Sequence, residues 1–468
     1  MVICYTEDKQ HCSGSIKFGS TVFSALPLFY FLSKNMKIVS AACHFVSPVI
    51  LMFCIDFPAT QLKGMPIQDL QTKKNQSTDT GWSQFRGSNS DGHASGPNSP
   101  ANWSGTENVV WKTSIAGLGW SSPVVGDGKI FLTTATEKED GLSLRALALN
   151  ESTGEIVWDR EINRVAKMPS IHKKNSHASP TALFHEGSVF VHFGTLGTAR
   201  LSTVDGKLLW KCLDLNYSPQ HGSGGSPVLH DGKLMVTCDG RDNPFVAALD
   251  IRTGNVIWKT KRSEKARIRF AFATPKVATV EGNTQLLAPG ADLLAAYDPG
   301  TGKEIWKVVA PGWSVVPQPV VGHGLVIYNH DYDHPELIAV RLGGQGDVTE
   351  SHIAWRIKRG APSTPSPILV GENLYFVSDN GIASCVNVKS GERIWMERLK
   401  GNYSASPVYA NGNVLFLNEL GLATWVSSGK EFEILGKNEL PGRTFATPAF
   451  SGGAMYIRTD QFIYKIAN

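Results

Sequence analysis

The sequence predicts an all-β protein: an eight-bladed β-propeller of four-stranded antiparallel blades, in which an N-terminal strand completes the last blade. The first observation behind this prediction is a repeat. A proline that opens a short apolar run recurs at intervals of about 40 to 57 residues, at Pro123, Pro180, Pro227, Pro275, Pro319, Pro367, Pro407 and Pro448. A sheet of this size cannot bury both faces alone, so neighbouring units must stack face to face.

The second observation is a glycine followed four residues later by tryptophan, as in Gly254 and Trp258. Tight turns such as Asp231-Gly232 and Thr253-Gly254 separate runs of β-branched and aromatic residues, which is typical of short antiparallel strands. A tryptophan buries a large area. We therefore expect packing between blades by Trp111, Trp158, Trp210, Trp258, Trp306, Trp355 and Trp395.

The third observation concerns closure of the ring. The last unit has room for only three strands before Asn468, whereas residues 108–113, ahead of the first unit, read as a strand that contains Trp111. We expect this strand to pair alongside residues 461–466. An open β-solenoid is the alternative, but it leaves the incomplete last unit unexplained.

The first 80 residues lack the repeat features. Residues 36–61 have a short basic start, an apolar stretch and small residues, which is the layout of a secretory signal. We interpret residues 1–35 as an extension of the gene model ahead of a start at Met36, and residues 62–80 as a disordered polar linker. A retained membrane anchor is the alternative for the apolar stretch. The propeller then spans residues 81–468, and the protein is exported to the periplasm, cell envelope or medium.

The charge and the cysteine content bear on the partners of the protein and on its disulfide bonds. The formal net charge is +4 and the basic residues are dispersed, which argues against a nucleic-acid partner. Within the propeller, Cys212, Cys238 and Cys385 lie in strand patterns and read as buried free thiols. A bridge between Cys212 and Cys238 is the alternative.

The connections between strands separate into two groups. First-to-second and third-to-fourth connections are uniformly tight and share one face of a propeller. The crossovers and second-to-third loops share the other face and contain the unusual polar clusters, so we place the candidate ligand-binding site there. Its candidate residues are His172, Lys173, Lys174, Asn175, His177, His221, Asp239, Arg241, Asp242, Asp331, Asp333, Arg359, Tyr403 and Arg443.

Each cluster has a simpler interpretation. Residues 172–177 also read as a solvated basic loop. The His and Asp residues of 330–334 are metal-ligand types, but neighbours in a short loop rarely converge on one ion, so we predict no metal site. Serines near His177 and His221 lack the strand-to-helix elbow of a serine nucleophile, so no catalytic residue is assigned.

The Thr-Gly-Lys…Trp pattern, together with Trp82-Ser83-Gln84-Phe85-Arg86-Gly87 and residues 222–227 and 402–407, resembles the pyrroloquinoline-quinone (PQQ)-type eight-bladed propeller repeats of exported bacterial proteins, especially those of planctomycetes. The same architecture serves BamB-type assembly scaffolds and quinoprotein dehydrogenases. For the second group the resemblance implies PQQ and calcium as cofactors. The adjacent cysteine pair of quinoprotein dehydrogenases is missing from this sequence, as is a Cys-x-x-Cys-His haem motif.

We therefore expect an exported, monomeric binding or scaffold protein that presents a polar loop face and a central funnel to a small polar ligand or a protein partner. One alternative is a PQQ- and calcium-dependent oxidoreductase. The other is a BamB-like scaffold for envelope assembly. No stable transmembrane span is expected.

Overall fold

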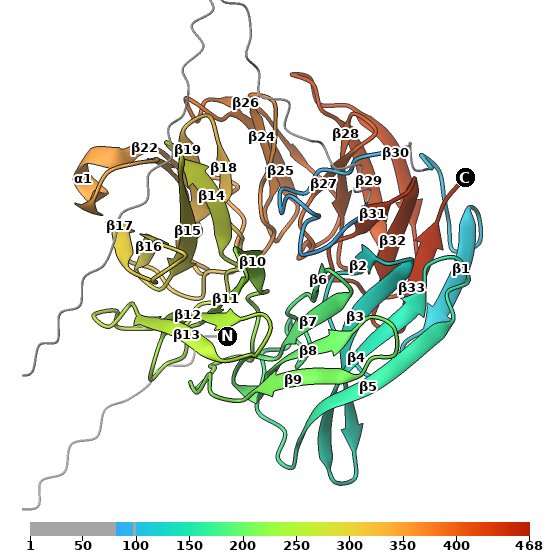
Figure 1. Cartoon of the computed structure of the whole chain (residues 1–468). Helices are drawn as coiled ribbons and strands as arrows, with labels where there is room; N and C mark the ends of the chain where they lie inside the picture. Colours follow the sequence, from blue (N-terminus) through green and yellow to red (C-terminus); the bar gives the residue numbers. More distant parts are fainter. Residues whose placement is uncertain (1–80, 97–99) are drawn as a thin grey trace, which may run out of the picture. The chain divides into compact units, whose positions relative to one another are not determined.

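The computed structural model describes residues 81–96 and 100–468. The expected gene-model extension, signal segment and linker within residues 1–80 lie outside the described residues. The described residues form a ring of eight antiparallel sheets, as predicted (Figure 1). Each sheet is a blade, and its strands follow one another from the central channel outwards.

The first four blades follow the chain in order. Their strands are β2 (Val124–Gly126), β3 (Lys129–Lys138), β4 (Gly141–Asn150) and β5 (Ile156–Val165); β6 (Leu183–His185), β7 (Ser188–His192), β8 (Thr198–Ser202) and β9 (Leu208–Cys212); β10 (Val228–His230), β11 (Lys233–Cys238), β12 (Phe245–Asp250) and β13 (Val256–Lys261); and β14 (Lys276–Val280), β15 (Asn283–Gly290), β16 (Leu293–Tyr297) and β17 (Glu304–Val309). A short 3-10 helix, η1 (Gly194–Leu196), lies between β7 and β8.

The remaining blades repeat the pattern. Their strands are β18 (Val320–Gly322), β19 (Leu325–Asn329), β20 (Leu337–Arg341) and β22 (Ile353–Ile357); β23 (Ile368–Val370), β24 (Asn373–Val377), β25 (Ile382–Asn387) and β26 (Arg393–Arg398); β27 (Val408–Ala410), β28 (Asn413–Leu417), β29 (Leu422–Ser427) and β30 (Ile434–Glu439); and β31 (Ala449–Ser451), β32 (Ala454–Arg458), β33 (Phe462–Ile466) and β1 (Val109–Ser114). Blade 5 also carries an insertion with β21 (Gly346–Asp347), which pairs with β17 of blade 4, and the short helix α1 (Thr349–His352).

Strand β1 closes the ring as the sequence predicted. It pairs antiparallel with β33, in a register from Val109 opposite Ile466 to Ser114 opposite Phe462 (Figure 1). The last blade therefore joins the two ends of the propeller, and no blade lacks a neighbour. The three cysteines of the described residues are free and buried, so the Cys212–Cys238 bridge considered as an alternative is not formed.

The repeated tryptophans lie between blades. Trp258 is 9% exposed, and its indole N–H donates to the carbonyl of Pro299 in the next blade at 3.0 Å. The turn glycine of that blade, Gly302, has φ +72°, and a Cβ there would lie 2.4 Å from the Trp258 ring. The same N–H donation to the next blade recurs at Trp111, Trp158, Trp210 and Trp355. The repeat thus encodes a blade-to-blade contact.

Two tryptophans depart from this pattern. Trp306 is fully buried but donates to Gln285 within its own blade, because the insertion that contains β21 replaces the usual turn of blade 5. The indole N–H of Trp395 is buried and has no hydrogen-bond acceptor among the described residues.

One of the eight recurring prolines departs from its expected position. Pro180 lies three residues before β6, whereas the other seven directly precede the first strand of their blades.

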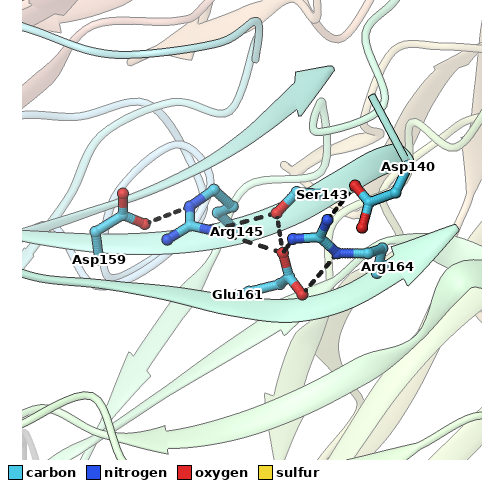
Figure 2. Close-up of polar contacts among 6 residues, drawn as sticks. All are labelled: Asp140, Ser143, Arg145, Asp159, Glu161 and Arg164. Carbon is cyan, nitrogen blue, oxygen red and sulfur yellow. Dashed lines mark hydrogen bonds and ion pairs between the residues drawn. The ribbon is translucent and has the colours of Figure 1, made fainter. Parts of the chain in front are cut away.

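Blade 1 has the longest strands: β3, β4 and β5 are ten residues each. A charged network joins β4, β5 and the turn between β3 and β4 (Figure 2). Arg145 donates to Asp159 at 2.8 Å, Arg164 bridges Glu161 and Asp140, and Ser143 donates to Glu161 at 2.5 Å. These ion pairs are partly exposed, and a single exposed ion pair contributes little to the stability of a protein. We interpret the network as a support for the extended ends of these long strands.

Residues 81–96 cross the face of the ring that carries the tight turns. Trp82 exchanges two backbone hydrogen bonds with Val125 of blade 1, and Arg86 donates to the carbonyl of Pro367 in blade 6 at 2.6 Å. Lys276 of blade 4 donates to the carbonyls of Asn89 and Ser90 at 2.6 and 2.7 Å. Trp82 and Arg86 are 2% and 1% exposed. This segment therefore closes one end of the central channel, and we refer to it as the plug.

Candidate functional site: the central cavity

A cavity of about 370 Å³ lies in the central channel. Phe85 of the plug lines it from one side. The other lining residues come from the innermost edge of the blades and from the loops of the crossover face, opposite the plug. Its aromatic lining residues are Phe85, Trp120, Phe270, Phe272, Trp313, Tyr332 and Phe445.

A ring of hydroxyl groups surrounds the channel. Each hydroxyl belongs to the residue two positions before the first strand of its blade. Its oxygen accepts the backbone N–H of the equivalent residue in the previous blade at 2.9–3.1 Å. We call Ser122, Thr181, Ser226, Thr274, Ser366, Ser406 and Thr447 the hydroxyl ring, and all of them line the cavity. In blade 5 the equivalent residue is Gln318, whose side-chain amide donates to Ser90 of the plug at 2.8 Å. The ring ties the blades together at their inner edge.

The crossover between blades 1 and 2 reaches across the channel. Lys174 on this crossover forms ion pairs with Asp379 of blade 6 at 3.5 Å and Glu419 of blade 7 at 3.0 Å. Burial lowers the pKa of Lys174, but the two carboxylates outweigh it and hold the pKa above its usual value. Both acids are themselves held by hydroxyls, since Thr364 and Ser404 donate to them at 2.6 Å. The crossover is thereby fixed over the cavity.

Two histidines form a wall beside this crossover. The rings of His172 and His221 lie 5.5 Å apart, and that of His221 lies 5.4 Å from Phe270. Burial lowers the pKa of both histidines, and for His172 the nearby Lys173 and Lys174 add to the effect. Both rings are therefore neutral near pH 7 and add aromatic surface to the cavity. Asn175 donates to the carbonyl of His221 at 2.7 Å, which joins the two crossovers.

The structure thus brings together part of the set that the sequence proposed. The residues of that set that line the cavity are His172, Lys174, Asn175, His221 and Asp333. Lys173 is exposed beside them. His177 instead lines a second, apolar hollow of about 310 Å³ with Met168 and Leu142.

Other residues of the proposed set have structural partners away from the cavity. Asp239 is buried and forms an ion pair with Arg262, whose Nε lies 2.8 Å from the carboxylate. Tyr403 is buried and donates to the carbonyl of Lys400, and burial raises its pKa. Asp331 is 4% exposed and accepts the backbone N–H of Asp333.

The exposed members of the set lie at the rim. Asp242 accepts both the N–H and the hydroxyl of Ser218, at 2.8 and 3.0 Å. Arg443 stacks on Phe445 with its guanidinium carbon 5.2 Å from the ring centroid. Arg241 and Arg359 are exposed. None of these four is among the lining residues of the cavity.

Sequence reasoning missed the hydroxyl ring and most of the aromatic lining. A signal for the ring was present, because serine or threonine precedes most of the landmark prolines. Phe270 and Phe272 alternate with alanines and read as an ordinary strand, so their position on a crossover gave no signal.

The cavity does not fit a PQQ and calcium site. Among its lining residues the charged side chains are Lys174, which is already paired with two carboxylates, and Asp333. The carboxylates of PQQ would therefore have no unpaired cation. No group of three His, Cys, Asp or Glu side chains suited to a metal ion occurs in the described part of the chain.

Comparison with known proteins gives the family. A family model described as outer membrane protein assembly factor BamB, with PQQ-type repeats (PQQ_2), matches residues 101–278 and 242–466. The two matches cover most of the chain. The chain belongs to this PQQ-repeat family. The prediction of PQQ-type repeats is confirmed.

Relatives within and around the family differ in what they do. The chain is 27% identical over 238 residues to a polyvinylalcohol dehydrogenase from Pseudomonas sp., covering 42% of this chain and 35% of that protein. It is 23% identical over 237 residues to BamB from Moranella endobia, covering 49% of this chain and 57% of that protein. The chain thus spans a third to somewhat over half of the length of these relatives.

Among solved structures, a europium-containing methanol dehydrogenase superposes with a TM-score of 0.56 at 13% identity, covering 81% of this chain and 89% of that one. At this identity the likeness shows the fold alone. None of the helices in the described residues is long and apolar enough to cross a membrane.

Proposed function

We propose that this PQQ-repeat chain is an exported binding protein that holds a small polar ligand in its central cavity, reached through the crossover face. The observation that carries the proposal is the cavity itself, which the plug closes on one side and which hydrogen-bonding and aromatic side chains line. Pockets of this volume and mixed lining are typical small-molecule sites.

The same lining argues for binding without chemistry. The lining hydroxyls that meet a carboxylate, Thr364 and Ser404, donate to Asp379 and Glu419, which are already paired with Lys174. None of the cavity's hydroxyls is hydrogen-bonded to His172 or His221, so the pairing of nucleophile and base that hydrolytic enzymes need is not formed.

A cavity-filling substitution tests the proposal. Val316 lines the cavity, so Val316→Trp should fill part of it, whereas Val204→Trp adds the same volume at a residue that is 75% exposed in the turn between β8 and β9. Purified wild-type protein would be screened by thermal shift against a library of small polar molecules. We expect hits that Val316→Trp loses and Val204→Trp keeps. Hits that survive Val316→Trp, or no hits, would contradict the proposal.

The likeness to polyvinylalcohol dehydrogenase supports a quinoprotein alternative, whereas the lining of the cavity speaks against it. Adding PQQ and Ca²⁺ to purified protein and recording the absorbance spectrum and dye reduction with alcohols decides it. Stoichiometric PQQ uptake with dye reduction would replace the binding proposal with an oxidoreductase.

A BamB-like scaffold in the cell envelope or periplasm, with protein partners, is the alternative that the family match supports. Fractionation of cells, followed by cross-linking in the envelope fraction, tests both location and partners. A monomer that stays free of partners in that fraction would speak against the scaffold. Sequencing the N-terminus of the natural protein tests export and the start at Met36.

A further inference from the structure

The hydroxyl ring has unused hydrogen-bond donors. Each of its hydroxyls accepts a backbone N–H, but none donates to an acceptor among the described residues. A hydroxyl carries one proton to donate. These seven residues are at most 4% exposed, with Thr274 and Ser406 the most exposed. The ring therefore offers several O–H donors to whatever fills the cavity.

The hydroxyls of the ring are spread over seven blades. Consecutive hydroxyls are separated by one residue and one hydrogen bond of 2.9–3.1 Å, and this step is repeated around the channel except at blade 5, where Gln318 replaces the hydroxyl. An ion that touches one or two hydroxyls leaves the others unpaired. The arrangement suits a molecule that carries oxygen acceptors at several points around its edge.

The aromatic lining suits the apolar faces of such a molecule. Trp120 and Phe445 form one wall, with ring centroids 4.6 Å apart. Phe270 and Phe272 form another, 5.9 Å apart, and Trp313 lies on the crossover between blades 4 and 5. Aromatic faces carry partial negative charge and attract the slightly positive hydrogens of C–H groups.

The charges in the cavity decide between an anionic and a neutral ligand. Lys174 is paired with two carboxylates, Asp333 adds a negative charge, and His172 and His221 are neutral near pH 7. A polycarboxylate would enter without a free cation, and burying an unpaired charge is costly. A neutral molecule avoids this cost.

We infer that the cavity binds a neutral carbohydrate, whose ring oxygens accept from the hydroxyl ring while its C–H faces pack on the aromatic walls. This inference rests on the proposed function and names its ligand class. Water filling the channel is the competing explanation, because water also satisfies unpaired hydroxyls.

Calorimetric titration with four neutral trisaccharides tests the inference: maltotriose, cellotriose, tri-N-acetylchitotriose and laminaritriose. We expect at least one to bind with one-to-one stoichiometry and a Kd below about 1 mM. Because the ligand is neutral, the Kd should stay within about twofold between about 50 and 500 mM salt. Trp313→Ala should weaken binding about fivefold or more, since this half-buried indole supplies aromatic contact area to the cavity. Phe432→Ala, at a half-buried ring packed on Trp395 outside the cavity, should leave binding unchanged.

Circular dichroism would verify the fold of each variant, and Phe270→Ala would replace Trp313→Ala if that variant does not fold. No binding by any of the four sugars at about 10 mM, or equal losses in Trp313→Ala and Phe432→Ala, would overturn the inference. The Val316→Trp screen separates the two claims. If the screen finds a cavity ligand but no sugar binds, the carbohydrate class is wrong and the binding function stands. If both fail, both are wrong.

Discussion

Asp239 allows a direct test of whether a polar loop residue serves the ligand or the fold. The sequence placed it in the candidate site, but the structure buries it against Arg262. Arg262 donates to both oxygens of the carboxylate and also to the carbonyls of Ala288 and Pro289 in the next blade, each at 2.9 Å. We predict that Asp239→Ala destabilises the protein and leaves ligand binding at the folded cavity unchanged.

The magnitude follows from the burial. Both side chains are fully buried, and removing one partner of a buried ion pair costs about 3–5 kcal/mol because the other charge remains in a medium of low polarity. For a propeller of roughly 390 residues, a loss of about 4 kcal/mol lowers the Tm by about 5 °C. Arg262→Met in the same chain removes the stranded charge, so the double variant should regain at least about 1 kcal/mol.

Scanning calorimetry of wild type, the two single variants and the double variant measures these differences. Asp242→Ala is the control, because its carboxylate lies in the same loop but is exposed, and its loss should cost no more than about 1 kcal/mol. An unchanged Tm for Asp239→Ala would refute the reasoning, as would a double variant less stable than both single variants.

Three further predictions concern the packing, the pH dependence and the plug. Trp258→Ala should cost about 3–5 kcal/mol in chemical denaturation, whereas Ile257→Ala, at a side chain 45% exposed, should cost less than about 1 kcal/mol; equal losses would contradict the packing role. Burial lowers the pKa of His192 to about 4, so between pH 6.5 and 4 the unfolded chain binds a proton that the folded chain does not. The free energy of unfolding should therefore fall by about 3 kcal/mol as the pH falls through this window, and His192→Gln should remove that component; an unchanged pH profile in the variant would exclude it. Trp82→Ala should loosen the plug and speed proteolysis within residues 81–96, and a cleavage pattern identical to wild type would argue against its anchoring role.

The sequence revealed those parts of the site that stand out locally, but not the residues that pair with them from distant parts of the chain. The crossover containing His172 and Lys174 was recognisable because it interrupts the repeat with an unusual polar cluster. Its partners, Asp379 and Glu419, are more than 200 residues away in the chain and lie in turns that look like any other. Nothing local distinguishes a carboxylate that crosses the channel from one that faces water.

The sequence by itself determined the repeat, the number of blades and the closure through β1, because seven of the blades are local runs of strands and turns and most of the repeated tryptophans donate to the blade that follows in the ring. Only the tertiary structure decided which side chains converge on the axis. The ring places residues from every blade around one channel, and burial then assigns Asp239 to Arg262 and Phe85 to the cavity. Convergence of this kind depends on the curvature of the whole ring, which no short stretch of sequence specifies.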